Sequence, residues 1–435
     1  MLGLMQDWPL LSHKVLDHAA MYHPDQEIVS RSVEGPIHRQ TYADLNIRSR
    51  KLAHALQKRG MKLGDIAGTM AWNGYRHLET WYGVMGLGAI VHTLNPRLFP
   101  EQLVYIIDHA EDSWFFVDLT FVPILEAIQD KLPKITTFVV MTDREHMPDT
   151  KLRGVLCYED LLAEGEEDFV WPEFDENTAC GMCYTSGTTG NPKGVVYSHR
   201  SNVLHGMTTN MADALGFKST DVIMPVVPMF HANAWSTAFS GPMSGAKMVM
   251  PGAQMDGASI HELLEGEGVT CTLAVPTVWL MLLQYLEQNP EKKLDALKRV
   301  VIGGSACPES MMKAFEEGYD VEVIHAWGMT EMSPLGTLGC KKGGMEDWAH
   351  EDWWPIKLKQ GRPPFTVEMR ITDDDGNELA RDGKAFGHLV VRGPCISKAY
   401  LKGEGGEILD DQGYFITGDV SNIDEHGFMQ ITDRS

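Results

Sequence analysis

The sequence predicts an α/β fold with a large N-terminal core of two parallel, helix-covered sheets and a smaller β-rich subdomain. Two observations predict this fold. Along residues 49–118, segments with apolar residues at helical spacing alternate with short apolar runs, an order typical of parallel sheets covered by helices. Residues 365–393 instead contain short alternating runs around an Asp-Gly pair, which is typical of antiparallel hairpins.

The helix-then-strand order occurs three times in the first part of the chain. Residues 49–60 have helical spacing and end at a glycine, and residues 65–72 then form an apolar run typical of a buried strand. The same order returns in 77–95 and in 102–118. We therefore expect a first α/β subdomain over residues 1–177 and a second over 178–353. A β-rich subdomain over 354–432 and the start of a hinge over 433–435 are expected to follow. Residues 341–354 are expected to form a connecting loop.

Composition excludes several classes of protein. The chain has 435 residues, of which 43% are hydrophobic, so it can bury large cores. Its formal net charge of −23 opposes binding to nucleic acid or to an anionic membrane surface. The N-terminal residues lack the pattern of a signal peptide and no apolar run reaches the length of a membrane span, so we expect a soluble, cytoplasmic protein.

The seven cysteines are scattered, which favours free thiols over a disulfide framework. Cys180 and Cys183 form a C-x-x-C pair within an apolar run. Residues three apart on a strand point to opposite faces, so we interpret both as core residues and not as a zinc or redox site.

A run of small hydroxyl residues and glycines follows that apolar run. Residues 184–195, "YTSGTTGNPKGV", contain Gly187, Gly190, Lys193 and Gly194, but the lysine spacing differs from that of a Walker A loop. The helix begins only after Ser198, a residue type that favours helix N-caps. The run has the components of a phosphate cradle, and a flexible surface loop between two strands is the alternative.

This run resembles the signature of the adenylate-forming superfamily, which includes acyl-CoA synthetases, luciferases and the adenylation domains of peptide synthetases. Other motifs similar to those of the superfamily follow in order over essentially the whole chain: "PMFHANAW" (228–235), "VIGGSACP" (301–308), "HAWGMTE" (325–331), "YFITGDV" (414–420) and "TDRS" (432–435). The similarity is greatest to short- and medium-chain acyl-CoA synthetases. It implies that a carboxylate attacks the α-phosphorus of MgATP to give an acyl-adenylate, and that coenzyme A then displaces AMP.

The resemblance also implies which residues bind the nucleotide and Mg²⁺. Those expected to hold the β- and γ-phosphates are Thr185, Ser186, Gly187, Thr188, Thr189 and Lys193. Thr330 would bind the α-phosphate, and Glu331 with Thr185 would bind Mg²⁺. Asp419 would accept hydrogen bonds from the ribose hydroxyls and Arg434 would donate to ribose or phosphate. The residues expected around adenine and its linkage are Gly304, Ser305, Ala306, Ala326, Trp327, Gly328 and Met329. Each of these roles has an alternative: Asp419 could cap a turn, Trp327 could be core and Glu331 a surface charge.

The acyl pocket is expected around His231, Trp235, Gly303, Gly328 and Pro334. His231 would position the substrate carboxylate, because a carboxylate that attacks as the anion needs no general base. Acetyl-CoA synthetases carry a bulky Trp where this chain has Gly328, so an acid longer than acetate is expected to fit. Trp235, Trp279 and nearby methionines favour a bounded apolar pocket for a short- or medium-chain acid, with 3-methylthiopropionate as a candidate.

Other functions fit the sequence less well. A luciferase, a peptide-synthetase domain and a P-loop kinase are disfavoured, whereas a non-catalytic nucleotide-binding scaffold and an enzyme with an acceptor other than coenzyme A stay open. A homodimer is compatible with the resemblance. In the superfamily, the residues after "TDRS" form a mobile C-terminal domain with a catalytic lysine, and we expect that domain to be absent from residues 1–435.

Overall fold

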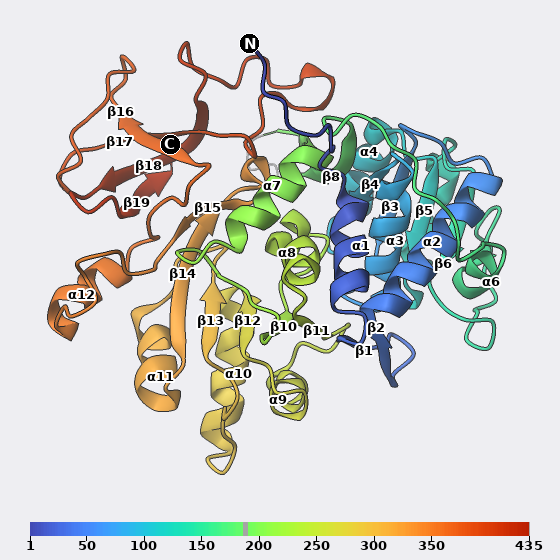
Figure 1. Ribbon diagram of the computed structural model, residues 1–435, viewed down its shortest axis with the longest axis horizontal. Coiled ribbons are helices and arrows are strands. Elements are labelled where there is room, and N and C mark those ends of the chain that lie inside the picture. Colours follow the sequence, from blue (N-terminus) through green and yellow to red (C-terminus); the bar gives the residue numbers. More distant parts are fainter. Residues whose placement is uncertain (186–189, 435) are drawn as a thin grey trace.

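The computed structural model describes residues 1–185 and 190–434. Figure 1 shows its layers: a first sheet with its helices on the right, a second sheet in the middle and a small β-rich subdomain at the upper left. The N-terminal segment crosses near the top of this view. The predicted fold class is confirmed, because both large sheets are mainly parallel and the small one is antiparallel.

The first sheet has the strand order β7-β6-β5-β3-β4-β8-β9, in which only the β8/β9 pair is antiparallel. Its strands are β3 (Ile66–Met70), β4 (Ile90–Thr93), β5 (Trp114–Val117), β6 (Thr137–Val140), β7 (Leu156–Cys157), β8 (Ala179–Tyr184) and β9 (Gly194–Ser198). Its central strands are buried on both faces, as the continuous apolar runs in the sequence predicted.

The second sheet has the order β15-β14-β13-β12-β10-β11-β1-β2 and is parallel from β14 to β1. Its strands are β1 (Glu27–Arg31), β2 (Ile37–Thr41), β10 (Val222–Pro225), β11 (Lys247–Met250), β12 (Cys271–Ala274), β13 (Arg299–Ile302), β14 (Glu322–Gly328) and β15 (Leu335–Leu338). The small antiparallel sheet consists of β16 (Glu368–Thr372), β17 (Phe386–Arg392), β18 (Phe415–Ile423) and β19 (Met429–Arg434).

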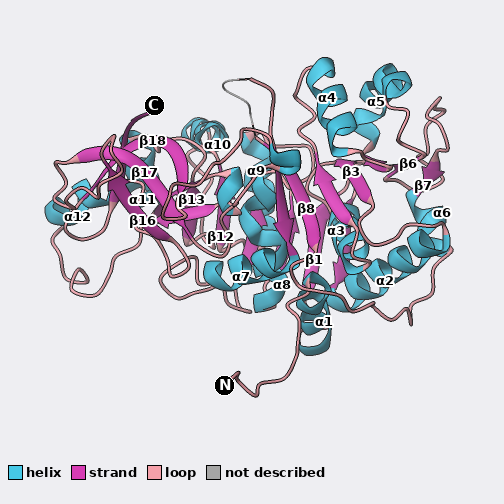
Figure 2. Cartoon of the chain, turned by 90° about the horizontal axis from the view of Figure 1, so that it is seen from above, coloured by secondary structure: helices cyan, strands magenta, loops and turns pink. Residues whose placement is uncertain are grey.

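The helices form three layers around the two large sheets. The layer between the sheets contains α1 (Ser12–Tyr22), α2 (Tyr42–Lys58), α3 (Tyr75–Gly86), α7 (His199–Thr209) and α8 (Thr237–Ser244), which share one apolar core with both sheets. The outer faces are covered by α4 (Pro100–Ala110) and α5 (Val122–Ile128) on the first sheet, and by α9 (Gly257–Gly266), α10 (Pro276–Gln288) and α11 (Glu309–Tyr319) on the second. Figure 2 shows α4 and α5 on the side of the first sheet opposite α2 and α3.

Of two local expectations from the sequence, one is confirmed and the other is corrected. The N-cap at Ser198 is confirmed, since its side chain accepts a hydrogen bond from Ser201 N at the start of α7. The loop expected over 341–354 is wrong at its end, because α12 (His350–Lys357) begins there. Its aromatic residues Trp353 and Trp354 are buried, so tertiary packing stabilises a helix that Pro355 and the preceding glycines disfavoured.

The strand pairing crosses the expected boundary at residue 177. β1 and β2 precede it but belong to the second sheet, whereas β8 and β9 follow it but extend the first sheet. The two α/β subdomains therefore interlock, and their expected limits stay a proposal. Among the described residues, no helix is both long enough and apolar enough to cross a membrane.

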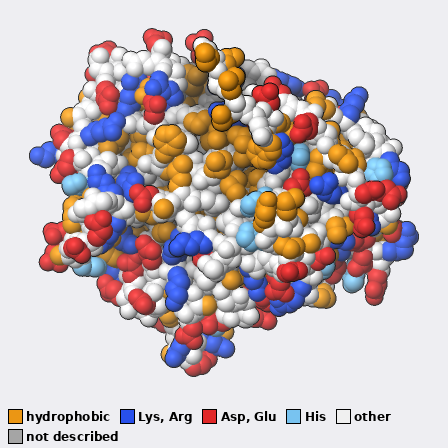
Figure 3. All heavy atoms as spheres, in the orientation of Figure 1, with side chains coloured by type: hydrophobic (Ala, Val, Ile, Leu, Met, Phe, Trp, Pro, Cys, Tyr) orange, Lys and Arg blue, Asp and Glu red, His pale blue; other side chains and the backbone are white. Residues whose placement is uncertain are grey.

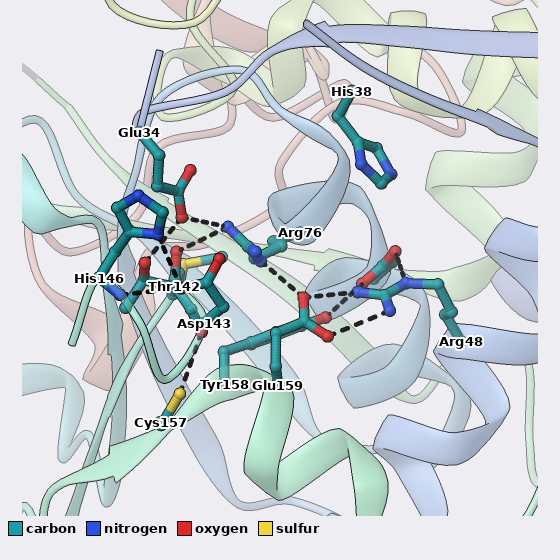
Figure 4. A network of polar contacts seen from close by, with 12 residues as sticks. Glu34, His38, Arg48, Arg76, Thr142, Asp143, His146, Cys157, Tyr158 and Glu159 are labelled. Carbon is teal, nitrogen blue, oxygen red and sulfur yellow. Dashed lines mark hydrogen bonds and ion pairs between the residues drawn. The ribbon is translucent and has the colours of Figure 1, made fainter. Parts of the chain in front are cut away.

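A polar network joins the tip of the β1–β2 hairpin to the first sheet (Figure 4). Arg76 on α3 donates to Glu34 in the hairpin turn at 2.6 Å and to Glu159 on α6 (Tyr158–Ala163) at 2.8 Å. Thr142, which follows β6, donates to the same Glu34 carboxylate at 2.7 Å. Because the hairpin belongs to the second sheet, this network ties the two sheets together.

Candidate active site

A cavity of about 540 Å³ lies where the parallel strands of the second sheet end and the β-rich subdomain begins. His231 follows β10, Gly303 follows β13, and Trp327 and Gly328 end β14. Ligands of open α/β sheets bind at the carboxyl ends of the strands. The position of the cavity is therefore the one that the topology favours.

Most of the predicted site residues with described side chains line this one cavity. They are Thr185, Lys193, His231, Trp235, Gly303, Gly304, Ala326, Trp327, Gly328, Met329, Thr330, Glu331, Pro334 and Asp419. Ser305 and Ala306 are exposed and do not line it. Ser186, Gly187, Thr188 and Thr189 lie outside the described residues, and so does the side chain of Arg434.

Thr185 and Lys193 close the two ends of the predicted phosphate loop. Thr185 N donates to Lys193 O at 2.9 Å, and Lys193 N donates to the Thr185 hydroxyl at 3.1 Å. These bonds continue the antiparallel β8/β9 pair by one residue on each strand. The base of the loop is thus fixed, and it holds the Thr185 hydroxyl and the lysine at the cavity.

Asp419 faces the cavity from β18, on the β-rich side. The residue is 2% exposed, and its carboxylate accepts a hydrogen bond from Trp327 Nε1 at 3.2 Å. The Trp327 ring packs in the core of the β-rich subdomain, and a methyl group on Gly336 would lie 2.4 Å from it. The indole therefore orients Asp419, while its predicted stacking on adenine stays a prediction.

Glu331 lies in a short 3₁₀ turn, η4 (Thr330–Met332), directly after β14. It is 6% exposed, and its carboxylate oxygen Oε1 accepts a hydrogen bond from the Tyr400 hydroxyl at 2.6 Å. Ser397 N donates to Glu331 O at 2.7 Å, and the Tyr197 hydroxyl donates to Thr330 O at 2.6 Å. Backbone and side-chain contacts thus hold this turn at the wall of the cavity.

His231 precedes a strained stretch of backbone. The five residues Ala232 to Ser236 all have φ between 44° and 71°, which costs non-glycine residues about 1–2 kcal/mol each. Strain of this kind clusters at functional sites. The His231 side chain opens onto the cavity, and the surrounding protein lowers the pKa of its imidazole by desolvation. The neutral form of the ring is therefore favoured.

The apolar end of the cavity extends between the second sheet and α7. It is lined by Leu215, Leu273, Val301, Leu335 and Leu338. The Trp235 indole borders it and lies against Gly303, where an added methyl group would come within 3.2 Å of the ring.

Two expectations about this pocket need correction. Trp279 is fully buried on α10, where it packs against Phe315, and it does not line the cavity. Gly328 does line the cavity, but a methyl group there would lie 2.1 Å from the Pro334 carbonyl oxygen. The glycine is therefore required first by the close approach of two backbone segments.

Some residues of the cavity were missed by the sequence analysis. Asn191, Thr417 and Tyr400 contribute to its polar side. Asn191 lies within the run 184–195 and Thr417 within the motif 414–420, so these motifs could have indicated both residues as part of the site. Tyr400 lies between β17 and β18 without a motif or a periodic pattern, and only the folded chain brings it to Glu331.

Comparisons with known proteins show the family to which the chain belongs. A family model described as AMP-binding enzyme matches residues 16–401. The chain is 48% identical to a medium-chain-fatty-acid–CoA ligase of Ectopseudomonas oleovorans, over 100% of this chain and 79% of that protein. It is 47% identical to a 3-methylmercaptopropionyl-CoA ligase of Ruegeria lacuscaerulensis, over 100% of this chain and 80% of that protein.

A solved structure has the same fold. The inhibitor-bound N-terminal domain of FACL13 from Mycobacterium tuberculosis superposes with a TM-score of 0.84 at 25% identity, covering 98% of this chain and 100% of that one. The chain belongs to the AMP-binding enzyme family. The resemblance seen in the motifs is thereby confirmed, and with it the assignment to the AMP-forming acid–thiol ligases, which use ATP and coenzyme A.

Proposed function

We propose that the cavity activates a short- or medium-chain carboxylic acid, with 3-methylthiopropionate as a candidate substrate. A carboxylate oxygen attacks the α-phosphorus of ATP and pyrophosphate leaves. The thiol sulfur of coenzyme A then attacks the acyl carbon and AMP leaves. One observation carries the proposal: Lys193, His231, Glu331 and Asp419, which come from separate segments, line the same cavity beside an apolar end.

The roles of these residues follow from their chemistry. Lys193 supplies a positive charge for the triphosphate, and the buried Asp419 supplies acceptors for the ribose hydroxyls. The neutral His231 ring can donate a hydrogen bond to the substrate carboxylate and hold it near the α-phosphorus. Positioning of this kind is the main requirement when both reactants are anions.

Mg²⁺ fits the donors that the site offers. Glu331 contributes a carboxylate and Thr185 contributes a hydroxyl, both of them oxygen ligands. In the described part of the chain, no group of three or more acidic, histidine or cysteine side chains could hold a metal alone. Mg²⁺ is usually held by one or two carboxylates together with substrate phosphates. Bound with ATP, it would offset charge on the phosphate oxygens.

The identity of the acid depends on the apolar end of the cavity. Two relatives of nearly equal identity are named for different acids, a medium-chain fatty acid and 3-methylmercaptopropionate. An apolar pocket discriminates weakly between a thioether sulfur and a methylene, so 3-methylthiopropionate should behave like a linear acid of about the same length.

The test is pyrophosphate release by the intact protein with linear acids of two to twelve carbons and with 3-methylthiopropionate. We expect a single maximum of kcat/KM at short or medium length. ATP binding without pyrophosphate release for any acid would instead indicate a nucleotide-binding scaffold. Release without thioester formation would indicate an acceptor other than coenzyme A.

Trp235→Ala is expected to move the chain-length optimum to longer acids, because removal of the indole lengthens the apolar end of the cavity. The measurement is kcat/KM across the same series of acids. Trp279→Leu is the matched control, since this tryptophan is buried away from the cavity and should affect stability without moving the optimum. A uniform fall in the Trp235→Ala profile would show that Trp235 supports the fold only.

A cytoplasmic location and a homodimer complete the proposal. ATP and coenzyme A are cytoplasmic substrates, and the free thiols of the chain suit a reducing compartment. Hydrophobic side chains gather in the upper middle of the face in Figure 3, and near the N-terminus Met1, Leu2, Leu4 and Met5 are exposed. These surfaces support self-association, which light scattering after size-exclusion chromatography would measure.

A further inference from the structure

Tyr400 contacts one acidic and one basic residue at the polar end of the cavity, Glu331 and Lys193. It lies between β17 and β18, in a segment that reaches the cavity from the β-rich side. Its hydroxyl donates to Glu331 Oε1 at 2.6 Å, and the Lys193 ammonium lies 5.4 Å from the centre of its ring. Among the described aromatic residues, only Tyr400 makes such a contact with Lys193.

The hydroxyl contact fixes the direction of the Glu331 carboxylate. A short bond to an ionised acceptor is among the stronger hydrogen bonds in proteins. A carboxylate oxygen accepts and a phenolic hydroxyl can donate, so in this bond the Tyr400 hydroxyl is the donor. The bond uses one acceptor position of Oε1, and the remaining lone pairs of the carboxylate stay available to a cation in the cavity that Glu331 lines.

The ring contact acts on the other charge. A cation over an aromatic face is attracted by the ring quadrupole. Gly405, in the same segment, leaves room for the lysine stem, because a methyl group there would lie 3.2 Å from Lys193 Cε. Among the described residues, the side chains of Lys193 and Glu331 each contact Tyr400 and form no ion pair with each other. Tyr400 contacts each of them separately, so the lysine remains available to an anion and the carboxylate to a cation.

We propose that Tyr400 is a positioning residue that orients Glu331 for the cation of MgATP and holds Lys193 at the phosphates. The inference rests on the proposed role of Glu331 as the residue that binds Mg²⁺. Partners that hydrogen-bond a metal ligand typically change metal affinity 10- to 100-fold when they are removed. The Tyr400 hydroxyl is such a partner, because it hydrogen-bonds Glu331. The ring has a different role, which is to hold the Lys193 ammonium.

The two tasks can be separated by substitution. Tyr400→Phe removes the hydroxyl and keeps the ring, whereas Tyr400→Leu removes both. Calorimetry would measure ATP affinity in EDTA and in Mg²⁺, and electron paramagnetic resonance would measure Mn²⁺ binding to the protein–ATP complex. Tyr414→Phe is the matched control, because Tyr414 also donates to a glutamate, Glu368, and contacts arginines, but lies away from the cavity.

We expect Tyr400→Phe to lower the affinity of the ATP complex for Mn²⁺ about 10-fold or more and to leave metal-free ATP affinity within about 2-fold. Tyr400→Leu should in addition weaken metal-free ATP binding, by about 2- to 10-fold. Tyr414→Phe should change neither. A purely structural role for Tyr400 would lower stability without this selective loss of metal affinity.

Glu331→Gln distinguishes the inference from the proposed function. If Glu331→Gln loses metal affinity and Tyr400→Phe does not, the positioning role is overturned and the proposed function stands. If Glu331→Gln binds Mn²⁺ and ATP like the unaltered protein, the assignment of Glu331 as a metal ligand is wrong, and the role of Tyr400 falls with it.

Discussion

Asp419→Ala is expected to weaken ATP binding by about 10²-fold or more and to leave the order of acid preference unchanged. Asp419 is 2% exposed and lines the cavity from β18. Hydrogen bonds to charged groups contribute about 1.5–3 kcal/mol each. Two such bonds to the ribose hydroxyls correspond to about 10²- to 10⁴-fold in affinity. In the proposed function the acid binds at the apolar end of the cavity, so the preference of the enzyme among acids should not change when nucleotide binding is weakened.

Calorimetric titration with ATP, together with pyrophosphate release across the acids, measures both parts of this prediction. Asp424→Ala is the matched control. Asp424 is also a buried aspartate of the β-rich subdomain, where it accepts from Phe428 N at 3.0 Å and pairs with Lys359. Its loss should lower stability and spare ATP affinity. An Asp419→Ala variant that bound ATP as tightly as the unaltered protein would exclude the ribose contact.

The parts of the site that follow parallel strands could be predicted from the sequence. Gly303 and Trp327 belong to motifs at the ends of β13 and β14, and the carboxyl ends of parallel strands meet at one edge of the sheet. Motif and topology therefore agree before any coordinates are known. Lys193 was predicted from its motif alone, since its loop joins the antiparallel strands β8 and β9 of the first sheet.

Residues positioned by packing between subdomains could not be predicted in this way. Tyr400 reaches Glu331, 69 residues earlier, only because the β-rich subdomain packs against the end of the second sheet. Likewise, the order of helices and strands along the chain does not predict that the β1–β2 hairpin pairs with β11 of the second sheet. Local propensity carries no information about either contact, since both depend on long-range burial.

Gly328 shows that the role of a glycine can be misjudged from the sequence. From the sequence, its small size indicated space for the acyl chain. In the structure, the close approach of the Pro334 carbonyl already excludes a side chain at this position. The close approach of the backbone thus requires a glycine at position 328, whatever the substrate is. Predictions of the preferred chain length are better based on Trp235, whose ring borders the apolar end of the cavity.

Arg76→Met is expected to lower the free energy of unfolding by about 3–5 kcal/mol, because it removes one partner of a buried ion-pair network. The Arg76 side chain is 10% exposed and bridges Glu34 and Glu159. Glu159 keeps its bonds to Arg48, whereas Glu34, which is 6% exposed, keeps only the Thr142 hydroxyl among its described side-chain partners. The cost should therefore come mainly from the buried charge left on Glu34, at the joint between the two sheets.

Urea unfolding followed by tryptophan fluorescence and far-UV circular dichroism would measure this loss. Arg144→Met is the matched control, because its ion pair with Asp160 is on the surface and should contribute less than about 1 kcal/mol. Adding Glu34→Gln to Arg76→Met should restore part of the stability, since glutamine removes the unpaired charge and still accepts from Thr142. Equal unfolding midpoints for Arg76→Met and Arg144→Met would show that the network does not hold the sheets together. ATP affinity of the folded Arg76→Met variant should not change, because the network lies apart from the residues that line the cavity.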